Sequence, residues 1–269
     1  MKKYVVIKPD EYCGMFGCLW QVIRGIYHNP DKLYYINFYE SIYNTTKDNV
    51  FDYFFYQPHI DHFPFASEIE KIVGHNSLPE NKEDSQFIWS MIQPNTKEEI
   101  QKRRIIFNSI ICKYLKLKPT IQEKIDLFIS KNFVNNKILG VHLRGTDHPY
   151  KQPINMYVDE IKKIESKYDK IFVTSDEQSR FDAIKNEFGE KVISYNALRS
   201  PIENTPLHMA LYETRWKRNP SYEYQYKIAE DVIIEAYLMS KTNFLCCFSA
   251  SNVNLFARAL NTELDCMEL

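Results

Sequence analysis

Residues 138–148 read ILGVHLRGTDH, an apolar run that leads directly into a turn crowded with charged and imidazole side chains. The apolar part predicts a buried strand over 138–143, and the turn after it carries Arg144, Asp147 and His148. Open α/β sheets bind their ligands just beyond the carboxyl ends of such strands. An arginine there can instead be a buried ion-pair partner, so the interpretation of Arg144 depends on the rest of the chain.

Apolar strands and helical patterns alternate on both sides of this segment, which predicts an α/β fold. The expected elements before it are a strand at 4–7, a helix at 16–27 and a strand at 33–38. After it we expect helices at 153–167, 178–188, 228–239 and 252–260, and strands at 170–175, 192–194 and 244–248. The simplest architecture is two α/β domains, 1–125 and 126–269, hinged near 120–136.

The middle of the chain predicts two helices. Residues 96–115 follow a helical pattern, with the charge run 102–104 expected on the solvent face. The residues expected inward are the isoleucines Ile100, Ile105, Ile106, Ile110 and Ile111. Pro119 is expected to end this helix, and Thr120 to cap a second one over 121–128. Residues 47–66 are rich in Phe and Tyr and predict a short strand and loops around an aromatic cluster.

Composition narrows the class of ligand. The 269 residues carry a formal net charge of -1, so nothing attracts the whole chain to nucleic acid or to an anionic membrane. An anion must therefore be captured by a local cluster, which favours a small ligand. No apolar run approaches the roughly twenty residues of a membrane span, and residues 4–7 resemble a first strand more than a signal peptide. Six scattered cysteines suggest reduced thiols and a cytoplasmic protein, and no spacing indicates a metal site.

Two further segments suit a phosphate. Residues 13–17, Cys-Gly-Met-Phe-Gly, lie between a strand and a helix, where Gly14 and Gly17 leave backbone N–H groups open to an anion or a sugar. A tight turn explains them equally well, and neither the dinucleotide-binding nor the P-loop spacing is present. Residues 244–252 form a buried strand that delivers hydroxyl and amide groups to a helix start, where Ser251 or Asn252 would act as N-cap or phosphate ligand.

Acidic side chains complete the candidate site. Asp231 and Glu235 lie four residues apart on a largely apolar helix, and an inward carboxylate there needs hydrogen-bond donors. The edge of guanine supplies two such donors, its ring N–H and its amino group. Asp176 follows the strand at 170–175, where it either caps the next helix or contributes to the same site.

In this order the motifs resemble the fucosyltransferase superfamily, which includes the α1,6-, α1,2- and protein O-fucosyltransferases. The matching segments are Gly14-x-x-Gly17, Gly-Val-His-x-Arg-x-x-Asp at 140–147, Val-Thr-Ser-Asp-Glu at 173–177, Glu-Asp-Val-Ile-Ile-Glu-Ala-x-Leu-Met-Ser-Lys at 230–241 and Phe-Ser-x-Ser-Asn at 248–252. The C-terminal half is most similar to the α1,6 group, whereas residues 30–130 match loosely.

The resemblance implies a GT-B fold, with two Rossmann-like domains facing across a cleft and GDP-fucose held mainly by the C-terminal one. Its motif arginine, which binds the diphosphate, corresponds to Arg144, and its guanine-contacting acid to Glu235, with Asp231 nearby. The neighbouring motif positions are His142 and Asp147, and the serine region that contacts phosphate is Ser249, Ser251 and Asn252. The loop that lines the cleft corresponds to Gly14, Phe16 and Gly17.

This chain departs from the family in two places. Many members have a second arginine directly after the first, where this chain has Gly145, and the catalytic acid expected a few residues later is missing. Asp147 and His148 are the candidates for the general base, with Asp10 and Glu11 as outsiders. The function implied is metal-independent, inverting transfer of fucose from GDP-fucose to a glycan, with α1,6 linkage favoured.

Three alternatives remain open. The first is an α1,2 enzyme, or one that uses another GDP-sugar. The second is a GDP-sugar-binding protein without catalysis, which the missing arginine and the unassigned base allow. The third, a phosphatase using a histidine with Arg144, is disfavoured because the Arg-His-Gly order is absent.

Overall fold

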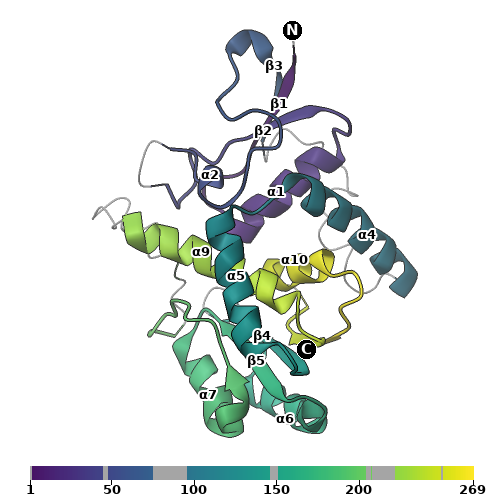
Figure 1. Ribbon diagram of the computed structural model, residues 1–269, viewed down its shortest axis with the longest axis vertical. Helices are drawn as coiled ribbons and strands as arrows, with labels where there is room; N and C mark the ends of the chain where they lie inside the picture. The colour runs from purple at the N-terminus through teal and green to yellow at the C-terminus, as the bar shows by residue number, and fades with distance from the viewer. Residues whose placement is uncertain are drawn as a thin grey trace.

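The computed structural model describes residues 2–44, 48–74, 96–145, 151–203, 207, 222–249 and 251–269. The chain is an α/β protein with two parallel sheets, as its sequence predicts. Figure 1 shows the sheets toward opposite ends of the view, with helices α1, α9 and α10 between them. These helices are Met15–Tyr27, Tyr222–Met239 and Asn252–Leu260.

The first sheet is built from a βαβ unit. Strands β1 (Tyr4–Lys8) and β2 (Leu33–Ile36) pair in parallel, and helix α1 connects them. Strand β3 (Ile69–Gly74) pairs in parallel with the other edge of β1. The short strand expected within 47–66 is not found in the described residues. There the chain forms a one-turn helix, α2 (Phe51–Phe54), and Phe55 after it makes an isolated antiparallel bridge to Leu117.

The second sheet has the order β6-β5-β4-β7-β8 and is also parallel. Its strands are β4 (Ile138–Leu143), β5 (Lys170–Ser175), β6 (Val192–Ile193), β7 (Phe244–Cys247) and β8 (Cys266–Glu268). Its crossover segments include α6 (Ile154–Ile164) and α7 (Gln178–Phe188). Since the chain runs outward from β4 in one direction and returns to β7 on the other side, the switch point of the sheet lies between β4 and β7.

Short 3₁₀ helices complete the described elements. They are η1 (Ala66–Glu68), η4 (Glu165–Lys167) and η5 (Gly189–Lys191). Within the described parts of the chain, no helix has both the length and the apolar character needed to cross a membrane.

Helix α4 (Lys97–Tyr114) has the predicted extent, and Ile110 and Ile111 are buried as expected, but the rest of the predicted inward face differs. Arg104 is buried, whereas Ile105 and Ile106 are exposed. The α-helical period puts Arg104, Phe107 and Ile111 on one side, so the two isoleucines fall out of phase with the core. The charge run 102–104 is therefore not wholly a solvent face.

Helix α5 (Pro119–Asn132) begins earlier than predicted. Pro119 is its first residue and Lys118 its N-cap, so the expectation that Thr120 caps the helix is wrong. Proline suits this position because the first helical N–H has no partner inside the helix.

The core runs between the two halves of the chain. Helix α10 packs on α1, α4 and α9, and α5 packs on α9. One hydrophobic cluster accordingly includes Trp20 and Phe107 together with Phe256. The predicted boundary at 125/126 lies within α5, and the division into two domains stays a prediction.

Candidate functional site

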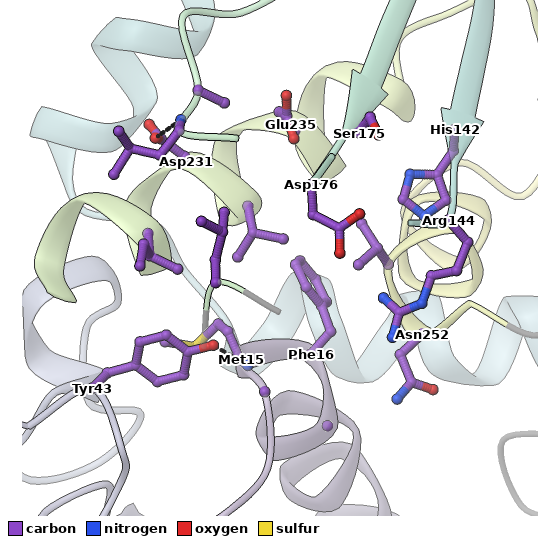
Figure 2. A pocket seen from close by; sticks show the side chains of 18 of the residues that line it. Met15, Phe16, Tyr43, His142, Arg144, Ser175, Asp176, Asp231, Glu235 and Asn252 are labelled. Carbon is purple, nitrogen blue, oxygen red and sulfur yellow. Dashed lines mark hydrogen bonds between the residues drawn. The ribbon is translucent and has the colours of Figure 1, made fainter. Parts of the chain in front are cut away.

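A cavity of about 260 Å³ opens at the switch point of the second sheet, where the start of α1 faces β4, β5, α9 and α10. Nine predicted residues line it: Gly14, Phe16, Gly17, His142, Arg144, Asp176, Asp231, Glu235 and Asn252. Figure 2 shows Arg144 and Asn252 on one side of the cavity and Asp231 and Tyr43 on the other. Segments more than two hundred residues apart in sequence thus meet in one place.

Arg144 and the start of α10 form the cationic side. Arg144 follows β4, and Asn252 is the first residue of α10, with Ser251 as N-cap. The indole N–H of Trp20 donates to the Asn252 carbonyl oxygen at 3.0 Å, which ties this helix start to α1. A guanidinium beside the positive end of a helix dipole is a site for a phosphate group.

The side chain of His142 links β4 to the start of α10. It is buried on β4, with Nδ1 at 3.0 Å from Thr174 Oγ1 and Nε2 at 2.9 Å from Ser251 Oγ. Burial, and then the charge of Arg144, lowers the pKa of His142 to about 3, so its ring is neutral at pH 7. Thr174 Oγ1 also lies 3.5 Å from the Val141 carbonyl oxygen and 3.4 Å from Met239 Sδ. Both ring nitrogens of His142 are therefore engaged by hydroxyl groups.

The serines predicted to contact phosphate are therefore placed differently from Asn252. The Ser251 hydroxyl is bound to His142 and makes no capping bond to α10. Ser249 is half-buried and does not line the cavity. What remains for an anion at this helix start is the Asn252 side chain and the backbone N–H groups.

Gly145 lets two chain segments approach closely. A Cβ atom at this position would lie 2.4 Å from Asp176 Oδ1 and 2.8 Å from Glu177 Cβ. Asp176 lines the cavity, and the N-cap of α7 is Glu177, so the interpretation of Asp176 as helix cap is wrong. A side chain at position 145 would therefore meet the wall that carries Asp176.

The two acids of α9 differ in their contacts. Asp231 accepts from the Leu198 N–H at 2.8 Å through one oxygen and pairs with Lys227 through the other. Glu235 is buried, and its Oε1 has no hydrogen-bond partner among the described residues. Burial raises the pKa of Glu235 to about 8, against the opposing effect of Arg199. Of these two acids, Glu235 is the one with an oxygen, Oε1, that accepts no hydrogen bond from the part of the chain that the structure describes.

The cavity also has an apolar side, which sequence reasoning missed. Leu198, Leu207, Ile228 and Val232 line it together with Met15. Planar rings suit such walls. The loop that carries Leu198 has no periodic pattern. It is held by the bond to Asp231 and by the Ser200 N–H, which donates to the Asp176 carbonyl oxygen at 2.8 Å, and both contacts join segments distant in sequence. No sequence signal could have found it.

The general base is not located by these contacts. Asp147 and His148 lie outside the described residues. Asp10 and Glu11 do not line the cavity, and a carboxylate oxygen of Asp10 accepts the Tyr12 N–H at 2.9 Å. Within the described ranges, no three His, Cys, Asp or Glu side chains cluster in a way that could hold a metal ion.

Comparison with known proteins gives a fold. No protein-family model matches the sequence, and no curated protein matches it significantly. Among solved structures, the chain is similar to NodZ α1,6-fucosyltransferase soaked with GDP-fucose, with a TM-score of 0.58, 15% identity, and coverage of 96% of this chain and 93% of that one. NodZ from Bradyrhizobium matches with a TM-score of 0.56, 16% identity and coverage of 96% and 93%.

A mutant of Arabidopsis thaliana FUT1 in complex with GDP is also similar, with a TM-score of 0.56, 12% identity and coverage of 99% of this chain and 70% of that one. At these identities the likeness establishes the fold. It is the GT-B fold, and the predicted resemblance to fucosyltransferases is confirmed at that level.

Proposed function

We propose that this chain is an inverting, metal-independent glycosyltransferase that moves fucose from GDP-fucose to a glycan hydroxyl, with α1,6 linkage favoured. One observation carries the proposal: a strand-end guanidinium, a helix start and a buried acid without a donor share one cavity at the switch point of the sheet. Support comes from NodZ, an α1,6-fucosyltransferase of the same fold whose crystals were soaked with GDP-fucose.

The two sides of the cavity suit the two parts of GDP, the diphosphate and the guanine. Arg144, Asn252 and the N–H groups of α10 would hold the diphosphate. The guanine ring would lie between the apolar walls, with its N–H donors toward Glu235. Asp231 is not available to these donors because both of its oxygens are already engaged. The fucose would then extend toward the glycine loop at Gly14.

The chemistry follows from where charge develops. The acceptor hydroxyl attacks the anomeric carbon from the face opposite the diphosphate, its proton passes to a base, and the bond to GDP breaks with inversion. Negative charge grows on the departing diphosphate, and Arg144 and the start of α10 stabilise it without a metal ion. Asp147 or His148 is proposed as the general base that takes the proton of the acceptor hydroxyl.

The test is a transfer assay with GDP-fucose on a glycan array, followed by linkage analysis of the product. Arg144→Ala should lower turnover by at least about a hundredfold, the scale for removing one donor to a developing anion. Lys102→Ala, which removes a solvent-exposed cation of α4, is the matched control and should keep full activity. Added EDTA should leave the rate unchanged. Wild-type turnover in the Arg144 variant would refute the assignment, and an EDTA-sensitive rate would refute the metal-free mechanism.

One observation favours a second candidate, a GDP-sugar-binding protein without catalysis. The wall at Gly145 leaves no room for the second cation of the family. A binder would retain GDP tightly and neither transfer nor hydrolyse the sugar, so the same assay separates the two functions.

A further inference from the structure

The side chain of Arg199 is buried, and its guanidinium lies beside Glu235, whose Oε1 has no hydrogen-bond donor among the described residues. Its Nη2 lies 3.9 Å from Glu235 Oε1, and the two side chains are 8% and 10% exposed. Arg199 does not line the cavity, so it reaches the site through Glu235. No motif or spacing in the sequence marks Arg199 as a site residue.

The guanidinium is held by its surroundings rather than by Glu235. Its central carbon lies 4.2 Å from the centre of the Phe181 ring on α7. Its Nη1 and Nη2 donate to the Ala197 and Tyr195 carbonyl oxygens over 3.3 Å, which is long for such bonds. Its Nε has no hydrogen-bond partner within the described residues. Besides these contacts, the carboxylate of Glu235 is the counter-charge that offsets the cost of burying the guanidinium.

The charges that face Glu235 come from three elements. Asp231 and Lys227 lie on α9, Asp176 follows β5, and Arg199 follows β6. The two aspartates raise the pKa of Glu235 and the two cations lower it, although burial has the largest effect. Lys227 is already paired with Asp231 and also donates to the Asn196 carbonyl oxygen. Arg199 is therefore the cation that opposes the loss of solvation at Glu235.

We propose that Arg199 is a positioning residue that lets Glu235 bind a guanine as a carboxylate, an inference that rests on the proposed GDP-linked donor. A carboxylate offers two acceptors to the ring N–H and the amino group of guanine. A neutral carboxyl offers one acceptor and one O–H, and the O–H opposes one of these donors. Guanine binding near neutral pH therefore expels the proton of Glu235, and Arg199 supplies the counter-charge.

The inference has a pH signature. For the wild type, GDP affinity should rise about tenfold per pH unit below about pH 8 and level off above it, because the free protein must lose one proton to bind. Arg199→Met raises the pKa of Glu235 further, which moves this rise to higher pH. The variant should bind GDP at least about tenfold more weakly at about pH 7 and recover part of the loss by about pH 9, below the pH at which the guanine ring N–H itself ionises.

The experiment is GDP titration by calorimetry over this pH range, with ADP titrated in parallel because its diphosphate has the same charge. Arg199→Lys keeps a positive charge and should shift the profile less than Arg199→Met. Glu235→Gln should bind weakly without the rise, and adding Arg199→Met to it should not restore any pH dependence. Should Arg199→Met fail to fold, Arg199→Lys and wild-type proton release carry the test. Wild type should release close to one proton per GDP at about pH 7, measured in buffers of different ionisation enthalpy.

Two failures can be told apart. A uniform loss of affinity at every pH in Arg199→Met, or the absence of proton release in wild type, would overturn the role of Arg199 while leaving GDP binding intact. No GDP binding by the wild type at any pH would instead overturn the proposed function, and this inference with it.

Discussion

At position 145 the backbone passes so close to Asp176 that a side chain has no room. Gly145→Ala should therefore destabilise the protein by about 1–3 kcal/mol, the range for an added group in a packed site, and should displace Asp176 from the cavity wall. Urea unfolding measures the loss. Gly14→Ala is the matched control, because the nearest atom to its Cβ would be Tyr43 Oη at 3.9 Å. Equal stability of the two variants would contradict this explanation.

His142 makes stability depend on pH. Its pKa is lowered to about 3, against about 6.5 for an unfolded histidine, so the unfolded chain binds more protons between these values. The stability from its neutral form is fully present above about pH 6.5 and falls on acidification, by up to about 1.4 kcal/mol per pH unit. We expect wild type to lose more stability than His142→Asn between about pH 7 and pH 5 in urea unfolding. Parallel losses would show that His142 is not the titrating group.

Single residues at strand ends and helix starts could be predicted from the sequence, and their partners could not. Arg144 and Asn252 follow from where apolar runs stop and polar residues begin, and Glu235 follows from its place within a largely apolar helix. The engagement of Ser251 by His142 and the pairing of Glu235 with Arg199 join segments that no spacing connects. These contacts decide which polar groups remain for a ligand.

At the scale of elements, α4 and α10 are joined by Arg104 and by Asn108, whose side-chain amide donates to the Ala259 and Leu260 carbonyl oxygens at 2.9 Å. Arg104 on α4 donates to the carbonyl oxygens of Arg258, Asn261 and Leu264 at 3.0, 2.7 and 2.8 Å, at and just beyond the C-terminal end of α10. Arg104→Met should cost about 2–4 kcal/mol, because it removes charged hydrogen bonds and leaves buried acceptors without a donor.

The matched control for this link is Lys102→Met on the exposed side of the same helix, and the measurement is the free energy of unfolding in urea. The control should change stability by less than about 0.5 kcal/mol. An equally small effect of Arg104→Met would mean that the link between the helices contributes little.

The positions of elements with a strong apolar period could be predicted from the sequence. Which face of a helix points toward the core was harder to predict. The parallel βαβ unit of the first sheet and the strand from Ile138 are where the pattern puts them. For α4, the isoleucines near the C-terminal end are buried as expected, but packing against α10 buries Arg104 and Phe107 where Ile105 and Ile106 were expected. A buried arginine that caps another helix looks, in sequence, like a solvent-exposed one.

In the whole molecule, the cavity lies where the first half of the chain meets the switch point of the second sheet. Helix α10 contributes its N-terminus to the cavity and its body to the core shared with α1 and α4. The fold could be predicted because alternating strands and helices leave few arrangements for a parallel sheet. The boundary between domains could not be fixed, since the helices at the middle of the chain pack on both halves.

The central claim is that Arg144 holds the diphosphate of a guanine nucleotide. A crystal structure of the protein grown with GDP tests it most directly. We expect the diphosphate within hydrogen-bond distance of the Arg144 guanidinium and the N–H groups at the start of α10, with the guanine edge on Glu235. A bound nucleotide that leaves Arg144 bonded only to protein atoms, remote from any phosphate, would contradict the account.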